Sequence, residues 1–202
     1  MEPCYIFSMK NVPRLCYFAA VVVLLFTYFQ WDIINIVTPF LIIFVAGPVY
    51  IFYLVTLVLS VVYLFKKWKS LKYNAMIPFG ASYIALILLT AFPFVEAKIY
   101  IDFYVNKYQF NRTVEMVHSG EIYPNTDYNR SMIHLPLGYR HLSKGGGDIE
   151  VGENYVFFFT FRGVLDNFSG YVYGHADPKR DLGCDVIDDI DLGNNWKWIS
   201  CS

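Results

Sequence analysis

Charged residues are scarce in the first half of this chain. Only 16% of the 202 residues are charged, whereas 56% are hydrophobic. Between Leu15 and Phe65 the only formal charge is Asp32, and between Tyr73 and Val95 there is none. An uncharged apolar run of about 20 residues can cross the hydrocarbon core of a bilayer as a helix. The missing charge excludes a purely soluble or secreted protein, and a net charge of −1 excludes a nucleic-acid-binding module that relies on positive charge.

Catalytic motifs are missing as well. The sequence contains no G-x-S-x-G elbow, no phosphate-binding loop and no G-x-G-x-x-G fingerprint. Gly145–Gly147 lacks the following Lys-Ser or Lys-Thr pair of a phosphate-binding loop and predicts a turn. No histidine pair has the helical spacing of a metal site, and no two cysteines form a C-x-x-C motif. We therefore expect no cofactor and favour a non-enzymatic protein.

The apolar half is predicted to form a membrane anchor over residues 1–95. Its expected spans cover residues 15–31, 38–65 and 75–94. Lys10 and Arg14 precede the first span, as basic residues do in a signal peptide, but no small-x-small cleavage pattern follows. We expect this span to be retained, with residues 33–37 at the outer interface and a kink at Pro48.

Basic residues orient the anchor. Lys10 and Arg14 lie before the first span, and four lysines lie between residues 66 and 72, whereas the loop between the first two spans carries only Asp32. Cytoplasmic segments are enriched in Lys and Arg. The N-terminus is therefore predicted to be cytoplasmic and the chain after Val95 to be outside. The compact plan favours a bacterial inner membrane and a periplasmic domain.

Residues 96–202 have a different composition. They hold 10 Lys or Arg against 15 Asp or Glu, a balance of −5, whereas residues 1–95 hold six against two, a balance of +4. About a hundred residues can bury a core of their own. The sequence therefore predicts a separate, acidic, extracytoplasmic domain.

The pattern within this domain predicts a small α+β fold, a stalk helix packed on an antiparallel sheet. Apolar residues recur every three or four positions from Ile99 to Val117, and the Gly at residue 120 is typical of a helix end. Residues 155–161 are aromatic and β-branched throughout, which favours a central strand covered on both faces. The predicted strands cover residues 132–135, 155–162, 168–173 and 196–201.

Cysteines are few, and two of the four lie in the predicted outer domain. Cys184 and Cys201 are the pair in that domain. An even number of cysteines in an oxidising compartment predicts a disulfide. Two unrelated free thiols are the alternative.

Aspartates are concentrated near the C-terminus, in what we predict to be a solvated loop. Such a loop is a candidate contact surface for a basic protein partner, because complementary charge raises the association rate and the specificity. Calcium is an alternative ligand, although the Asp-x-Asp-x-Asp-Gly core and the terminal Glu of an EF-hand are missing. The candidate residues are Asp181, Asp185, Asp188, Asp189 and Asp191.

Arg162 and Asp166 extend the candidate partner surface into the turn after the central strand. A polar loop on a rigid hairpin is a common place for recognition. The alternative is a salt bridge between Arg162 and Asp166 across a turn that needs Gly163 for its backbone angle.

Three functions of different classes follow from these features. The leading hypothesis is a non-enzymatic membrane protein whose acidic domain binds a protein partner, as a toxin-immunity factor or an envelope-assembly accessory factor. The second is a membrane-bound effector whose soluble domain senses a ligand and gates the helices, as in some antiviral signalling systems. The third is a hydrolase that assembles its site from His134, His141 and nearby carboxylates. The lipid bilayer is an expected partner, and small residues in the spans allow homo-oligomers.

Overall fold

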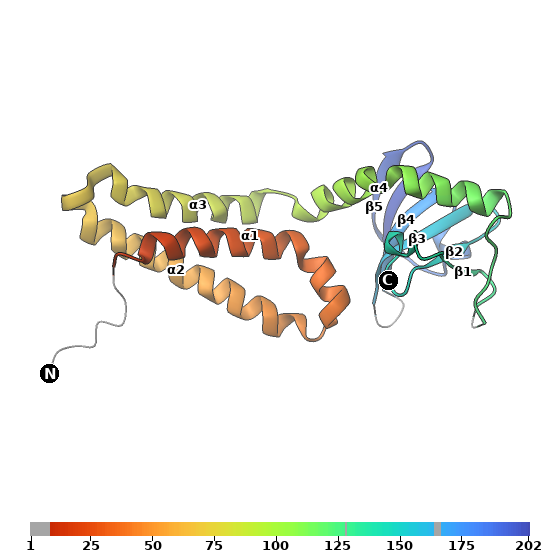
Figure 1. Ribbon diagram of the computed structural model, residues 1–202, viewed down its shortest axis with the longest axis horizontal. Coiled ribbons are helices and arrows are strands. Elements are labelled where there is room, and N and C mark those ends of the chain that lie inside the picture. The colour runs from red at the N-terminus through yellow and green to blue at the C-terminus, as the bar shows by residue number, and fades with distance from the viewer. Residues whose placement is uncertain (1–8, 128, 164–166) are drawn as a thin grey trace. The chain divides into compact units, whose positions relative to one another are not determined.

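The computed structural model describes residues 9–127, 129–163 and 167–202 (Figure 1). Contacts divide the chain into two compact units, Met1–Val95 and Glu96–Ser202. The division falls at the residue where the charge balance changes sign. Each unit is described by itself below.

The first unit is helical. It consists of α1 (Val12–Val37), α2 (Ile42–Leu71), the 3-10 helix η1 (Lys72–Ala75) and α3 (Met76–Ala91). Among the described residues, two helical runs are long and apolar enough to cross a membrane, Val12–Val37 and Ile42–Ala91. The sequence predicted three spans. The count differs because α2, η1 and α3 form one helical run of 50 residues, in which α3 alone has 16.

The first helix is longer than predicted. The span was expected to end near Trp31, with residues 33–37 at the outer interface, whereas the helix α1 continues through Asp32 to Val37; its C-cap residue, Thr38, has a φ of 80° and a ψ of 153°. The next residue is Pro39, and a proline disfavours helical backbone at the residue before it. The helix therefore ends where proline forces the chain to leave it, rather than at the charged residue.

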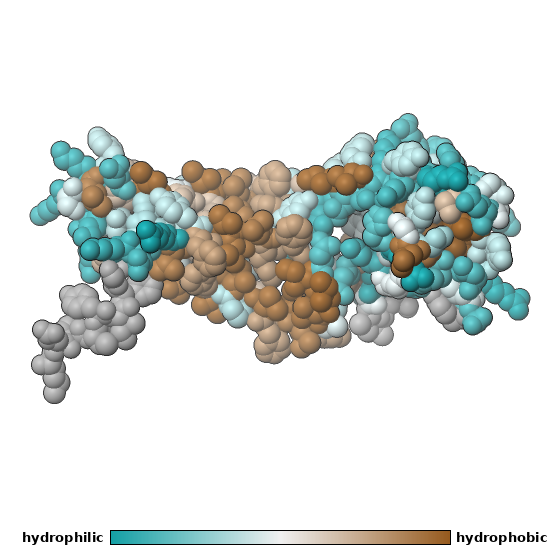
Figure 2. Space-filling model, viewed as in Figure 1, coloured by the Kyte–Doolittle hydropathy of each residue, from teal (hydrophilic) through white to brown (hydrophobic). Residues whose placement is uncertain are grey.

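Small and polar side chains lie between the helices, and large apolar side chains lie outside. Ala19 and Val23 of α1 pack with Tyr53 of α2 and Ala85 of α3. The Tyr53 hydroxyl donates a hydrogen bond of 2.6 Å to the backbone oxygen of Ser82. Figure 2 shows the outer residues as a hydrophobic band over these helices, with hydrophilic residues at the end where α2 turns into α3. This distribution is typical of helices in lipid, where small residues allow close packing.

The second unit has the predicted α+β layout. Its long helix is α4 (Phe94–His118), and its described residues form one antiparallel sheet of six strands in the order β1-β2-β3-β4-β6-β5. The short helices are η2 (Arg140–Leu142) and α5 (Pro178–Asp181). The strands are β1 (Met132–His134), β2 (Asp148–Val151), β3 (Tyr155–Arg162), β4 (Phe168–Gly174), β5 (Val186–Gly193) and β6 (Trp196–Cys201).

Aromatic rings join α4 to one face of the sheet. Phe110 of α4 has its ring centroid 5.0 Å from that of Phe158, 5.1 Å from that of Tyr171 and 5.6 Å from that of Trp196. The Tyr171 hydroxyl donates to the backbone oxygen of Ile99 at 2.9 Å. Burial raises the pKa of Tyr171, so its hydroxyl remains a donor. The aromatic face of α4 is thus positioned by packing and by a buried hydrogen bond.

A second core covers the opposite face. Phe157 and Phe159 of β3 pack there with Val172 and Ile199, and Leu182 lies against them from the segment around α5. Successive side chains of a strand point to opposite faces. β3 is therefore covered on both faces, as the sequence predicted. Gly170 of β4 is required here because a Cβ atom at that position would lie 2.6 Å from the ring of Phe157.

Replacing Phe110 with alanine is predicted to destabilise the second unit by about 3–5 kcal/mol, because a buried aromatic ring and its ring contacts are lost. The free energy of unfolding is measured by urea titration of the full chain in detergent. Glu115→Ala, on an exposed part of the same helix, is the matched control and is expected to change the value by no more than about 0.5 kcal/mol. Equal effects of the two substitutions would contradict the assigned packing.

Candidate functional site

The aspartates near the C-terminus lie mainly in a strand, which corrects the prediction of a loop. Asp188, Asp189 and Asp191 belong to β5, and they lie opposite Ser200, Ile199 and Lys197 of β6. Aspartate is disfavoured in strands, so the sequence pattern did not indicate one. The backbone of β6 supplies a continuous ladder of hydrogen-bonding groups, and this tertiary contact overrides the preference of the aspartates.

β5 lies at an edge of the sheet. Among the described residues, no strand pairs with its outer side. Its acidic side chains are exposed, and so are Val186 and Ile187, at 42% and 66%. The register shifts twice along β5, between Val186 and Asp188 and between Asp191 and Gly193. The edge therefore offers backbone hydrogen-bonding groups, two apolar side chains and carboxylates on both faces of the strand to anything that approaches it.

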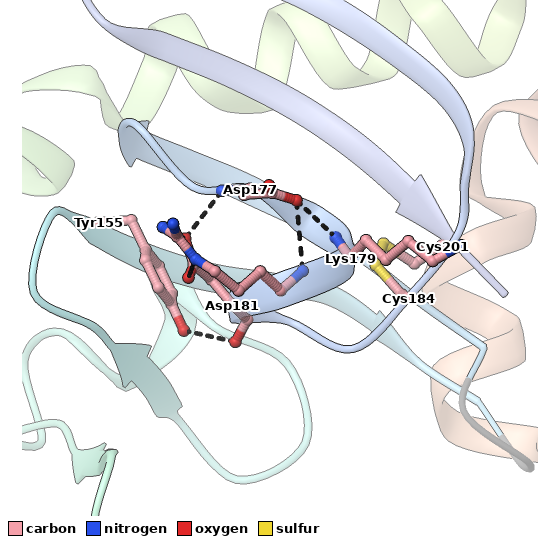
Figure 3. Close-up of a disulfide and its surroundings, with 7 residues drawn as sticks. Tyr155, Asp177, Lys179, Asp181, Cys184 and Cys201 are labelled. Atoms are coloured by element: carbon pink, nitrogen blue, oxygen red, sulfur yellow. Dashed lines mark hydrogen bonds and ion pairs between the residues drawn. A yellow bond between two sulfur atoms is a disulfide. The ribbon is translucent and has the colours of Figure 1, made fainter.

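A disulfide joins the chain between α5 and β5 to the end of β6. Cys184, just before β5, is joined to Cys201 at the end of β6, with their Cα atoms 5.5 Å apart (Figure 3). The pair is the one expected from the sequence. Asp185 follows at once, and its backbone exchanges two hydrogen bonds with that of Ser202. Its side chain is 80% exposed and lies 3.4 Å from the ammonium group of Lys179.

Asp181 does not belong to the edge. It lies in α5, where its carboxylate accepts hydrogen bonds from the backbone N–H of Asp177 and from the side chain of Arg180. The hydrogen bond from Arg180 holds the pKa of Asp181 below its usual range. The backbone oxygen of Asp181 also accepts from the hydroxyl of Tyr155 at 3.1 Å (Figure 3). Asp181 therefore stabilises the covering segment, and the candidate surface is reduced to Asp185 and the aspartates of β5.

Arg162, like Asp181, lies apart from the acidic edge strand β5. Its guanidinium group covers the ring of Phe159 at 4.4 Å, and Nη1 lies 3.8 Å from Oδ2 of Asp148. β3 and β5 are separated in the sheet by β4 and β6, so Arg162 is not part of the β5 edge. Asp166, the other residue predicted in this turn, lies outside the described residues.

Asp148 is a residue that sequence reasoning missed. It is only 7% exposed, and its Oδ1 atom lies 2.6 Å from Nδ1 of His134. His134 of β1 and Asp148 of β2 are directly opposite in the antiparallel register. The sequence signal was weak because β2 is a four-residue strand with two acidic residues. The backbone oxygen of Asp148 accepts a hydrogen bond from the hydroxyl of Ser143. This bond holds the turn between residues 143 and 148 against the start of β2.

The two histidines of the hydrolase hypothesis have different partners. His134 lies against Asp148, whereas Nε2 of His141 lies 2.7 Å from the side-chain oxygen of Gln109 in α4. Within the described part of the chain, no three His, Cys, Asp or Glu side chains lie close enough together to hold a metal ion.

Comparison with protein-family models, with curated proteins and with solved structures found no match for this chain. Its function is therefore inferred from the arrangement of its own residues.

Removal of the disulfide is predicted to lower the free energy of unfolding of the second unit by about 3 kcal/mol, because it frees a loop of this length in the unfolded chain. The two cysteines are 17 residues apart in the sequence. The measurement compares urea titrations of the wild type and of the variant with both Cys184→Ser and Cys201→Ser.

Reductant supplies the control for the disulfide. It should destabilise the wild type and change its electrophoretic mobility, and it should have no effect on the double variant. A wild type trapped by alkylation in cells with both thiols free would contradict the bond.

The partly buried carboxyl group of Glu150 gives a pH prediction. Burial raises the pKa of Glu150, although a hydrogen bond with Tyr155 and the charge of Arg162 act in the opposite direction. A raised folded-state pKa means that stability is lost as pH rises from the unfolded-state pKa, about 4.3, through the folded-state value. Glu150→Gln should therefore raise the melting temperature at pH 7 relative to wild type, and the difference should shrink below pH 4. The control Glu153→Gln, at an exposed position, should show no such pH-dependent difference in melting temperature.

Proposed function

We propose that this chain is an integral membrane protein whose outer unit binds a basic protein partner along β5. The observation that carries this proposal is the acidic strand at an open sheet edge. The proposal has two parts, the anchor and the partner surface, which are supported by different residues.

Three membrane crossings account for the helical unit. A straight helix of 50 residues would be about 75 Å long, whereas the hydrocarbon core is about 30 Å thick. The run Ile42–Ala91 is interrupted at Lys72, whose φ is 47°. A crossing by α2, a turn at the lysines and a return by α3 therefore fit a bilayer better than one crossing.

The distribution of charge and the disulfide support the proposed orientation. Three lysines lie in the last turns of α2 and Lys72 begins η1, so basic residues gather where α2 leads into α3, and such segments are enriched on the cytoplasmic side. Three crossings from a cytoplasmic N-terminus place the second unit outside. Cys184–Cys201 supports this placement, because disulfides persist in oxidising compartments such as the bacterial periplasm.

Strand addition is the binding mode that suits β5. An extended segment of a partner can pair with the free backbone groups of an edge strand, while side-chain contacts select the partner. The carboxylates of Asp188, Asp189 and Asp191 favour a segment with Lys or Arg. The same carboxylates oppose pairing between two copies of β5, because like charges would meet. The edge is thus suited to a different protein, such as a toxin that an immunity factor neutralises or a component of an envelope assembly.

Photo-crosslinking tests the partner surface in native membranes. A photoreactive amino acid at Ile187 is expected to give a discrete protein adduct, because this side chain is 66% exposed on β5. The double substitution Asp188→Lys and Asp189→Lys should reduce the yield of that adduct at low salt, because it reverses the charge that attracts the partner.

The matched control places the same amino acid at Leu137, which is 81% exposed outside the sheet edge. An identical adduct from Leu137, or a yield that charge reversal leaves unchanged, would count against binding along β5.

A further inference from the structure

The helix α4 carries a row of exposed aromatic and aliphatic side chains that the fold does not use. The spacing of Tyr100, Tyr104 and Tyr108 by four residues places them on one helix face, and Ile101 and Val105 lie beside them. Tyr108 is 81% exposed and Val105 is 75% exposed. The other side of α4 is buried against the sheet through Phe103 and Phe110. We call these five exposed residues the tyrosine stripe.

The stripe occupies only the half of α4 that follows the helical unit in the chain. Beyond Tyr108 the same face continues with Arg112 and Glu115, and Arg112 forms exposed ion pairs. A gradient from apolar to polar along the chain is expected when the first part of the helix is closest to a bilayer.

Chain connectivity keeps the stripe close to the proposed membrane. α4 begins at Phe94, and α3 ends at Ala91. Between them the helix is broken at Phe92, which has extended backbone before Pro93. This break separates the two helices, so α4 is not a continuation of α3. At 1.5 Å per residue the stripe, from Tyr100 to Tyr108, is about 12 Å long and starts nine residues after α3.

Tyrosine has the chemistry of the lipid headgroup region. Its ring is apolar and its hydroxyl is polar, so tyrosines are enriched where hydrocarbon meets water. Lys107 borders the stripe, with its ammonium group 5.2 Å from the ring centroid of Tyr104. A lysine in this position can keep its charge near lipid phosphates while its methylene groups cover the ring.

We infer that the tyrosine stripe binds the headgroup region of the bilayer that α1–α3 cross, so that α4 is an interfacial helix and not a free stalk. This inference rests on the anchor part of the proposed function, and it is independent of the partner surface on β5. The ligand is the lipid interface itself, with Lys107 directed to anionic headgroups.

Spin-label accessibility in the full chain tests this inference. The chain is reconstituted in phosphatidylcholine–phosphatidylglycerol vesicles with Cys4→Ser and Cys16→Ser, which leaves the disulfide in place. A nitroxide is attached at Tyr104→Cys, and its collision rates with oxygen, which partitions into lipid, and with a water-soluble nickel chelate are compared.

Two matched positions calibrate the measurement. Val58→Cys lies in α2, where the native side chain is 61% exposed, and represents contact with lipid. Glu115→Cys lies on the face of α4 that carries the stripe and represents water. The expected oxygen-to-nickel ratio at Tyr104→Cys lies above that at Glu115→Cys and below that at Val58→Cys, as it should for a site at headgroup depth.

Three results would overturn the inference, and they have different meanings. A ratio at Tyr104→Cys equal to that at Glu115→Cys, with a lipid-like ratio at Val58→Cys, removes the interfacial helix and leaves the anchor. Protection from both reagents, with spin–spin broadening that disappears on dilution with unlabelled protein, shows that a second copy covers the stripe. A water-like ratio at Val58→Cys removes the anchor and the inference together.

Discussion

The structure of the second unit depends on one constraint, the burial of β3 on both of its faces. Phe158 points to one face, and Phe157 and Phe159 point to the other. Neither face of this strand can be left to water, so the chain has to supply two covers. The first is α4, a helix of 25 residues with aromatic side chains and hydrogen bonds to the sheet. The second is the short segment around α5, which offers little more than Ala176 and Leu182.

The unequal covers explain where the disulfide lies. A short segment with two modest apolar side chains gains little from burial, and α5 has only four residues. Asp177 caps α5 by accepting hydrogen bonds from two backbone N–H groups, and Cys184 then joins the segment to β6. The covalent bond limits the unfolded chain, so the second cover remains in place without a large apolar area. It also holds the start of β5 next to the end of β6. The same disulfide therefore stabilises both the second core and the position of the edge strand β5.

The sequence predicted the features that repeat over many residues and missed those that depend on pairing. The helix from Ile99 to Val117 and the aromatic strand from residue 155 were evident from periodicity and composition, because each side chain has the same surroundings every turn or every second residue. β5 was not evident, since its aspartates disfavour a strand and only the neighbouring β6 makes one. The contact between His134 and Asp148 was missed for the same reason, because it exists only through the register of β1 and β2. Sequence proximity grouped Asp181 with the aspartates of β5. In the structure its carboxylate instead accepts hydrogen bonds from the backbone N–H of Asp177 and from Arg180, within the segment around α5.

The two proposed contact surfaces, the tyrosine stripe and β5, have opposite chemistry. This difference favours lipid as the surroundings of the stripe and water as the surroundings of β5. The tyrosine stripe is uncharged and bordered by Lys107, so it can approach a bilayer that contains anionic lipids. β5 is acidic and would be repelled by the same lipids over about a Debye length of 8 Å at physiological salt. Within the second unit α4 lies on a face of the sheet, while β5 is its edge strand (Figure 1). An orientation that brings the stripe to the headgroups is therefore most favourable when it also turns β5 toward water, where a basic partner can reach it. Under both proposals, the balance of −5 in this unit would act in two ways, attracting a basic partner and keeping the β5 edge away from anionic lipid.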